Sequence, residues 1–263
     1  MSGQEKIKLA IKTLLGKHCC NVDPNQRYQY PDDWQRKRKY YGQYGEDAKI
    51  FPLFQGQSNG FFVEVGAMEG IRFSNTYLFE RLGWQGICVE PHPRYFALLK
   101  KNRSRAILVS AAVGKEDKEK VNFYLNYRGS LSSLDNSLEK FFQTHYSQWF
   151  GGYSKIQVPM MTLNTLLSAN HVPAGFDILS IDTEGTDWEV LVGFDIRYYA
   201  PRVIIVEISI RKERVHQYLE THGYILACTN PSNAIFCKNL TDARLVRLSA
   251  VVGFSASPRH PLD

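Results

Sequence analysis

The 263-residue sequence predicts an α/β protein whose doubly wound, mostly parallel sheet is closed by a C-terminal antiparallel hairpin. Three observations favour this fold class. Apolar runs of strand length recur along the chain, each run is continuous rather than alternating with polar residues, and helical stretches separate the runs. Strands of this composition are buried on both faces, which is typical of parallel sheets covered by helices on each side.

The individual elements follow from the same pattern. Five apolar runs are expected to form the parallel strands, at 61–65, 86–89, 106–109, 177–181 and 203–206. The spacing of apolar residues indicates helices at 75–83, 94–102 and 186–193. The last two runs, at 224–228 and 234–237, flank a short polar segment. This spacing is typical of a hairpin, so the two runs are expected to pair antiparallel and close the sheet.

The chain is predicted to have three parts. Residues 1–50 are expected to form a helix and a covering segment, because apolar residues have helical spacing at 5–17 and residues 21–42 are polar and aromatic. Residues 51–240 carry the regular α/β pattern, and 241–263 are expected to form a C-terminal tail. A chain of this length fits a single hydrophobic core.

Composition and hydropathy exclude disordered and membrane-spanning classes. Apolar residues make up 44% of the chain, which is enough to build a core. No run approaches the roughly 20 apolar residues that span a bilayer. Lysines interrupt the apolar residues at 5–17, where a signal peptide needs an unbroken stretch. We therefore expect a cytoplasmic protein.

Charge and cysteine content exclude two further classes. The formal net charge of +6 is mild, and only residues 36–39 form a basic cluster. Because nucleic-acid surfaces need clustered positive charge, no nucleic-acid partner is expected. The five cysteines lack the spacing of zinc ligands, which favours buried thiols over a metal site. Nothing in the pattern indicates an oligomeric state.

A glycine turn follows the first expected strand, with the sequence Gly66-Ala67-Met68-Glu69-Gly70. A strand, a glycine turn and a helix bring backbone N–H groups to the sheet edge where ligands bind. The spacing differs from the dinucleotide fingerprint, and Glu69 would repel a pyrophosphate. The turn suits a ligand with a small carboxylate, such as the methionine end of S-adenosylmethionine, so Gly66 and Ala67 are expected cofactor contacts.

The next two strand ends extend this predicted pocket. The second strand ends at Glu90 and Pro91, and Glu90 is twenty-four residues after Gly66. An acidic residue at about this distance accepts hydrogen bonds from ribose hydroxyls. The third strand is followed by Ser110 and Ala111, small residues that leave room for an adenine ring. These four residues are therefore also expected cofactor contacts.

Three carboxylates follow the fourth and fifth expected strands. Asp182 and Glu184 come after 177–181, and Glu207 comes after 203–206. The carboxyl ends of parallel strands share one crevice, so these groups are expected to orient an acceptor and take its proton. Helix capping by Asp182 or Glu184 is an alternative reading. A magnesium site on Asp182 and Glu207 is a further alternative that we do not favour.

Several motifs occur together in a fixed order. They are GQYGED at 42–47, FFVEVGA at 61–67, SNT at 74–76, LGWQGICVEP at 82–91, SSL at 132–134, IDTEG at 181–185 and EVLVGF at 189–194. Over residues 41–238 the chain resembles the FkbM family of S-adenosylmethionine-dependent methyltransferases. The resemblance implies a class I (Rossmann-like) methyltransferase fold and methyl transfer to a hydroxyl oxygen. It also implies cofactor contacts at Glu64, Gly66, Gly70, Asn75, Glu90 and Asp182.

The acceptor is expected to be a sugar, a glycan or a nucleotide-sugar. Aromatic residues at 28–44 and 141–153 would provide a stacking wall for a carbohydrate, although packing explains them equally well. A secondary-metabolite alcohol and a silent cofactor-binding protein are the alternatives. A nucleic-acid base methyltransferase is disfavoured, because 182–185 lacks the Asp/Asn-Pro-Pro-aromatic motif of the enzymes that methylate amino groups of bases. His92 and His145 are secondary candidates for the base.

Overall fold

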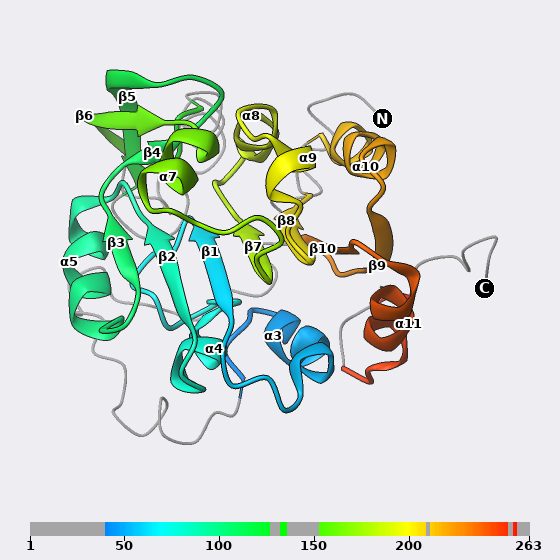
Figure 1. The fold of residues 1–263 in the computed structure, drawn as a ribbon. Coiled ribbons are helices and arrows are strands. Elements are labelled where there is room, and N and C mark those ends of the chain that lie inside the picture. Colours follow the sequence, from blue (N-terminus) through cyan, green and yellow to red (C-terminus); the bar gives the residue numbers. More distant parts are fainter. Residues whose placement is uncertain (1–39, 127–131, 136–152, 209–210, 252–254, 257–263) are drawn as a thin grey trace.

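The computed structural model describes residues 40–126, 132–135, 153–208, 211–251 and 255–256 (Figure 1). Within these ranges the chain forms one eight-stranded sheet and one three-stranded sheet. The expected N-terminal helix, the basic cluster 36–39, His145 and all but the last residue of 141–153 lie outside the described residues. None of the helices in the described part is long and apolar enough to cross a membrane.

The central sheet has the strand order β11-β9-β10-β8-β7-β1-β2-β3. Its strands are β1 (Phe61–Val65), β2 (Gln85–Val89), β3 (Ile107–Val109), β7 (Ile178–Ile181), β8 (Val203–Glu207), β9 (Ile225–Thr229), β10 (Asn233–Cys237) and β11 (Ser255–Ala256). The first five are parallel, whereas β10 is antiparallel to both β8 and β9. The predicted mostly parallel sheet with a C-terminal antiparallel hairpin is confirmed.

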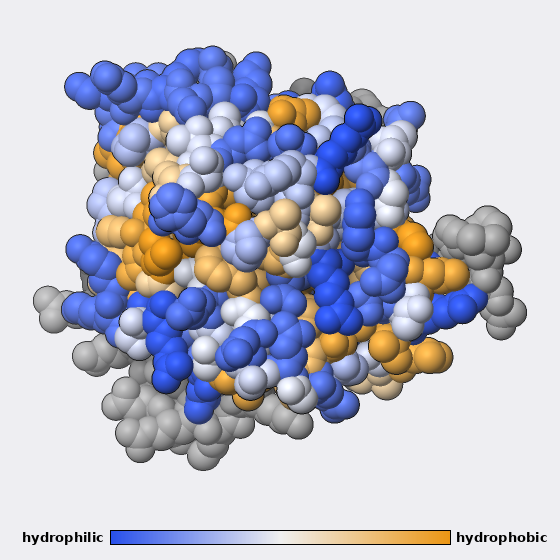
Figure 2. Space-filling view, in the orientation of Figure 1, coloured by the Kyte–Doolittle hydropathy of each residue, from blue (hydrophilic) through white to orange (hydrophobic). Residues whose placement is uncertain are grey.

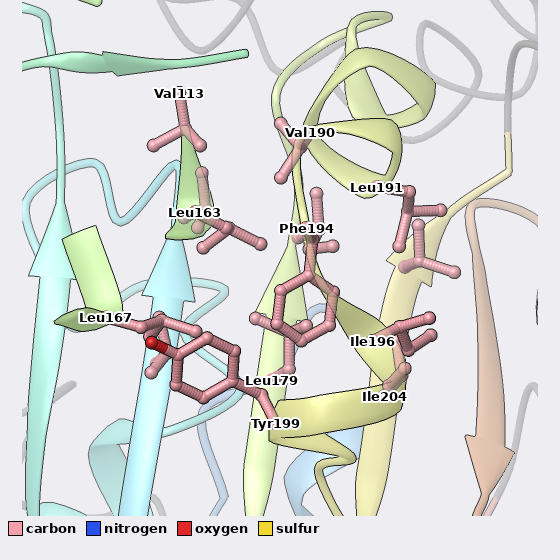
Figure 3. Packing of buried hydrophobic residues seen from close by; sticks show 14 of the residues in the cluster. Val113, Leu163, Leu167, Leu179, Val190, Leu191, Phe194, Ile196, Tyr199 and Ile204 are labelled. Carbon is pink, nitrogen blue, oxygen red and sulfur yellow. The ribbon is translucent and has the colours of Figure 1, made fainter. Parts of the chain in front are cut away.

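The inner strands of the central sheet are buried on both faces: successive side chains point to opposite sides, and a hydrophobic cluster covers each side. In β1, Val63 belongs to one hydrophobic cluster and Phe62 to another. The helices of the first cluster are α7 (Leu163–Ala169), α8 (Asp187–Val192), α9 (Ile196–Tyr199) and α10 (Lys212–Thr221), and Figure 3 shows Leu163, Phe194 and Tyr199 packing there. The helices of the second are α3 (Glu46–Ile50), α4 (Tyr77–Arg81), α5 (Pro93–Asn102) and α11 (Leu240–Leu248). The sheet is therefore doubly wound.

The C-terminal segment contains more structure than a tail. Residues 240–248 form α11, and Ala243 and Val246 are fully buried against the central sheet. The spacing of these two residues places them on one helical face. The outer side of α11 exposes Leu245 and Leu248, and Figure 2 shows apolar residues near this helix, at the lower right of the view.

The three-stranded sheet is not predicted from the sequence. It consists of β4 (Ala112–Val113), β5 (Lys118–Asn126) and β6 (Tyr153–Met161), in the order β4-β6-β5. It lies beyond the carboxyl ends of β1 and β2 (Figure 1). Its small apolar cluster includes Phe123 and Val158, while charged residues at the start of β5 are exposed. A strand that is mostly exposed lacks the continuous apolar run that identifies a central strand.

A buried ion-pair network holds α4 and α5 against β1. The side chain of Arg103, at the end of α5, is fully buried and pairs with Glu64 of β1 and Glu80 of α4. The guanidinium group also donates to the hydroxyl groups of Ser74 and Thr76. A buried charge is tolerated when it is paired and hydrogen-bonded in this way.

Arg103→Met should strongly destabilise the protein, because it leaves Glu64 and Glu80 as uncompensated buried charges. We expect a loss of about 3–5 kcal/mol in the free energy of unfolding, measured by urea denaturation. Lys118→Met, which breaks an exposed pair with Glu116, is the control and should cost about 0–1 kcal/mol. Equal losses in the two variants would contradict a structural role for the network.

Candidate functional site

Two cavities open at the carboxyl ends of β1, β2 and β7, and they share one wall. The shared wall consists of Val65, Gly66, Met68, Asp182 and Glu184. The first cavity, with ≈ 600 Å³ of empty space including its open mouth, extends to Glu90 and Ala111. The second, with ≈ 530 Å³, extends to Asn75 and Arg72.

Gly66 allows β1 and β7 to meet closely at the shared wall. Its φ is +84°, and a Cβ atom on it would lie 1.7 Å from the carbonyl oxygen of Asp182. The two residues are adjacent because β1 pairs with β7, and the Asp182 N–H donates to the Val65 carbonyl at 3.0 Å. Only glycine fits here, on conformational and on steric grounds.

The glycine turn does not lead directly into a helix, and the helix expected at 75–83 is α4. Helix α4 begins only at Tyr77. The N–H groups of Gly66 and Ala67 both donate to the carbonyl of Val89, at 3.0 Å each. The turn is thereby tied to β2, and these two N–H groups are used within the protein.

Glu90 lies at the end of β2 and faces the first cavity. One carboxylate oxygen accepts the N–H of Met68 at 2.8 Å, and the other accepts the N–H of His92 at 2.7 Å. Burial raises the pKa of Glu90 to about 7, while these two N–H groups favour the charged form. Each oxygen retains acceptor capacity, so Glu90 can accept two ribose hydroxyls.

Backbone strain is found around the cavities. Met68, Phe73 and Glu184 each have a positive φ, at 49°, 63° and 55°. For residues other than glycine this conformation is unfavourable, and it is enriched at functional sites. At Met68 it accompanies the N–H contact with Glu90.

Asp182, Glu184 and Asp187 form a group of interacting carboxylates. Burial, followed by the nearby charge of Asp187, raises the pKa of Asp182 to about 7. Burial and the repulsion from Asp182 raise the pKa of Glu184 well above its ordinary value. Helix α8 begins after Thr186 and has no side-chain cap, so neither Asp182 nor Glu184 caps it. The capping alternative is therefore wrong.

Glu64 and Asn75 line the second cavity. The Glu64 carboxylate accepts the Asn75 N–H at 3.0 Å and lies within the network of Arg103. The Asn75 amide nitrogen donates to Ser180 Oγ at 3.1 Å. Its Oδ1 atom is buried and has no hydrogen-bond partner among the described residues. Asn75 therefore presents an unused acceptor beside the cavity.

Three of the predicted site residues line neither cavity. Glu207 is buried at the end of β8, in register with Asn233 of β10. Gly70 lies over α5, where a Cβ would come within 2.6 Å of Leu99 and Arg103. Ser110 is exposed after β3. The roles assigned to Glu207, Gly70 and Ser110 stay predictions.

Several lining residues were missed by the sequence analysis. Tyr95 of α5 and Phe123 of β5 line the first cavity, and Gln43 and Arg72 line the second. Tyr95 follows Glu90 closely in sequence, which is a weak indication that it lines the same cavity. Phe123 gave no such indication, because it belongs to the sheet that was not predicted. The described residues contain no group of three or more His, Cys, Asp or Glu side chains arranged to hold a metal ion.

The parallel sheet with its C-terminal antiparallel hairpin, the glycine turn at β1 and the acidic residue at the end of β2 fit a class I S-adenosylmethionine-dependent methyltransferase. The family model described as the methyltransferase FkbM domain matches residues 64–226, more than half of the chain. The protein belongs to this family, and S-adenosyl-L-methionine is its cofactor.

Solved methyltransferase structures resemble the chain at low identity. A TehB-like SAM-dependent methyltransferase from Corynebacterium glutamicum shares 10% identity, with a TM-score of 0.39 over 74% of this chain and 88% of that chain. A putative RNA methyltransferase from Pyrococcus horikoshii shares 14% identity, with a TM-score of 0.37 over 89% of this chain and 98% of that chain. A precorrin-6y C5,15-methyltransferase from Geobacter metallireducens shares 16% identity, with a TM-score of 0.42 over 79% of this chain and 98% of that chain. A search of curated proteins found no match.

Gly66→Ala tests the close contact at the shared wall. The new methyl group would overlap the Asp182 carbonyl, so we expect a loss of about 1–3 kcal/mol in unfolding free energy beyond that of a control, and loss of S-adenosylhomocysteine binding. The control is Gly175→Ala, which also has a positive φ but has no atom within 4 Å of its Cβ position. Thermal unfolding and calorimetry provide the two readouts. Similar effects in both variants would show that only backbone conformation matters.

Glu90→Gln tests the contact with ribose. The amide has one acceptor oxygen in place of two, so it cannot accept both backbone N–H groups and both hydroxyls. Hydrogen bonds to a charged group contribute about 1.5–3 kcal/mol, which predicts a loss in S-adenosylhomocysteine affinity of roughly 10- to 100-fold. Titration calorimetry measures this loss, with the exposed Glu116→Gln as control. An unchanged dissociation constant would remove Glu90 from the binding site.

Proposed function

We propose that this protein transfers the methyl group of S-adenosyl-L-methionine to a hydroxyl oxygen of a sugar, a glycan or a nucleotide-sugar. The observation that supports this proposal is the position of Asp182 and Glu184. Both carboxylates lie on the wall between the two cavities, and burial raises the pKa of each. A group of this kind can take the proton of an alcohol near neutral pH.

The residues of the first cavity fit the adenosine part of the cofactor. Glu90 offers acceptors for ribose hydroxyls, and Ala111 and Phe123 provide a small and an aromatic surface suited to adenine. Gly66 leaves room at the shared wall for the chain that joins adenosine to the amino-acid end. When bound, S-adenosyl-L-methionine supplies an electrophilic methyl group.

The remaining task of the protein is to align the acceptor and to accept one proton. Positioning of the reactants can account for much of the rate. Asp182 is the better base, because its pKa of about 7 leaves much of it ionised at neutral pH. Burial and the charge of Asp182 also raise the pKa of Glu184, and in its protonated form this group can donate a hydrogen bond to the acceptor.

The choice of a sugar is supported by the family resemblance rather than by the aromatic residues. Tyr41, from the first aromatic segment, is buried and packs edge-on against Tyr77, with ring centroids 4.8 Å apart. It therefore contributes to the core and does not line a wall for carbohydrate. The predicted cytoplasmic location also stays a prediction.

A panel of sugars, nucleotide-sugars and non-sugar alcohols tests the acceptor class. Each compound is incubated with the protein and S-adenosyl-L-methionine, and mass spectrometry detects products that have gained one methyl group. We expect methylation of a sugar hydroxyl, with release of S-adenosylhomocysteine. Methylation of non-sugar alcohols alone would refute the sugar assignment. Methylation at nitrogen or carbon alone would refute O-methyl transfer.

Asp182→Asn tests the proposed base once an acceptor is found. We expect turnover at saturating cofactor to fall by at least about 100-fold, because the amide cannot accept a proton. In the wild type only the ionised carboxylate accepts a proton, so the rate should rise with pH up to about 7 and then level off. Initial rates across this range measure the profile. The exposed Glu220→Gln is the control, and an unchanged rate in Asp182→Asn would exclude Asp182 as the base.

A further inference from the structure

The segment 132–135 approaches the first cavity beside the wall carboxylates. Ser132 and Leu134 line this cavity, whereas Ser133 between them does not. Ser133 forms an antiparallel bridge with Tyr124 of β5: its backbone N–H donates to the Tyr124 carbonyl at 3.1 Å, and its carbonyl accepts the Tyr124 N–H at 2.9 Å. Because side chains alternate along an extended segment, Ser133 points away from the side on which its two neighbours line the cavity.

The hydroxyl group of Ser133 reaches the loop that follows β7. It donates to the backbone carbonyl of Glu184 at 2.8 Å, and its oxygen accepts the N–H of Asp135 at 3.0 Å. A serine hydroxyl group has one proton, and here that proton is directed at Glu184. Ser133 is 1% exposed, so water does not compete for this contact. A segment bridged to β5 therefore holds the backbone of a residue on the shared wall.

The backbone of Glu184 is strained where this contact is made. Its φ is +55°, and Gly185 follows with a φ of +103°. The left-handed conformation is unfavourable for a residue with a Cβ atom, so it persists where the surroundings hold it. Thr183 is held from one side, because the carboxylate of Asp187 accepts its N–H at 2.8 Å. Ser133 holds the other side of the turn, at the Glu184 carbonyl.

This turn supplies a hydrogen-bond donor to the proposed base. Burial raises the pKa of Asp182, and so do the charges of Asp187 on the same loop, Glu46 of α3 and Glu64 of β1. The carboxyl group of Glu184 also interacts with Asp182. The backbone N–H of Glu184 acts in the opposite sense, as a hydrogen-bond donor that lowers the pKa of Asp182. A contact from an Asp side chain to the second following N–H is typical of an Asx turn.

We propose that Ser133 is a positioning residue for the reaction: by holding the Glu184 carbonyl, its hydroxyl group keeps the Glu184 N–H on the carboxylate of Asp182. The catalytic meaning of this contact rests on the proposed role of Asp182 as the base. Ser133 acts through the loop, since it lines neither cavity. The same segment places Ser132 and Leu134 in the first cavity, so the base is held by a wall of the cavity that receives adenosine.

The first test measures the proton affinity of Asp182 without cofactor or acceptor. Aspartate is labelled with carbon-13 at its carboxyl carbon, NMR follows the titration, and the Asp182 signal is identified by its loss in Asp182→Asn. In the wild type the pKa of Asp182 is expected at about 7. Ser133→Ala should raise this pKa by about one pH unit, because the ionised form loses its donor. Ser133→Thr keeps the hydroxyl group and should restore the wild-type value.

Tyr224→Phe is the matched control. It removes a buried hydroxyl group that donates to the carbonyl of Pro201 at 2.8 Å, and Tyr224 lines neither cavity. The pKa of Asp182 should therefore be unchanged in this variant. An unchanged pKa in Ser133→Ala, an equal rise in Ser133→Thr, or a Ser133→Ala protein that fails to fold would refute the positioning role.

The second test uses the acceptor identified with the panel of sugars and alcohols. If the pKa of the base rises by one unit, Ser133→Ala should lower turnover at pH 7 by about fivefold and recover nearly wild-type turnover at about pH 9. The KM for S-adenosyl-L-methionine should change by less than about twofold, because Ser133 lines no cavity. An equal loss of turnover at both pH values would refute the role of Ser133. Unchanged turnover in Asp182→Asn would instead refute the proposed base, while the NMR titration would still decide the hydrogen-bond arrangement.

Discussion

The contact between Gly66 and the carbonyl of Asp182 determines where the other groups of the site lie. β1 is flanked by β2 on one side and β7 on the other, and ligands bind at such a switch point of a parallel sheet. With no side chain at Gly66, the ends of β1 and β7 remain together and Asp182 reaches the wall between the cavities. A larger residue would separate the proposed base from the strand end that carries Glu90.

The buried carboxylates make the site a source of instability. Glu90 and Asp182 have folded pKa values of about 7, well above their ordinary values, so the folded state binds more protons than the unfolded state between pH 4 and 7. By linkage, the free energy of unfolding falls as pH rises through this range. The ligand-free protein is thus less stable at the pH at which these carboxylates are ionised and can accept hydrogen bonds or a proton. Donors on the cofactor, such as ribose hydroxyls and an ammonium group, offset part of this penalty.

The sequence predicted the elements that are buried and missed those defined by tertiary contacts. Continuous apolar runs located β1 and β8 closely, because burial on both faces leaves a clear local signal. β5 gave no such signal, since much of it is exposed. Gly70 is predicted as a cofactor contact, which stays a prediction, and the structure adds a packing role, because Leu99 and Arg103 lie where its side chain would be. Which role a glycine has depends on residues distant in sequence, and one chain alone does not reveal them.

The loop from residue 69 to 76 shows how one segment combines support with recognition. On its inner side, Ser74 and Thr76 are held by Arg103, whose hydrogen bonds are made entirely within the protein. On its outer side, Arg72 and Asn75 face the second cavity. A recognition loop anchored in this way loses little conformational entropy when a ligand binds. The buried Arg103, paired with Glu64, therefore fixes the backbone of the loop whose other side lines the second cavity.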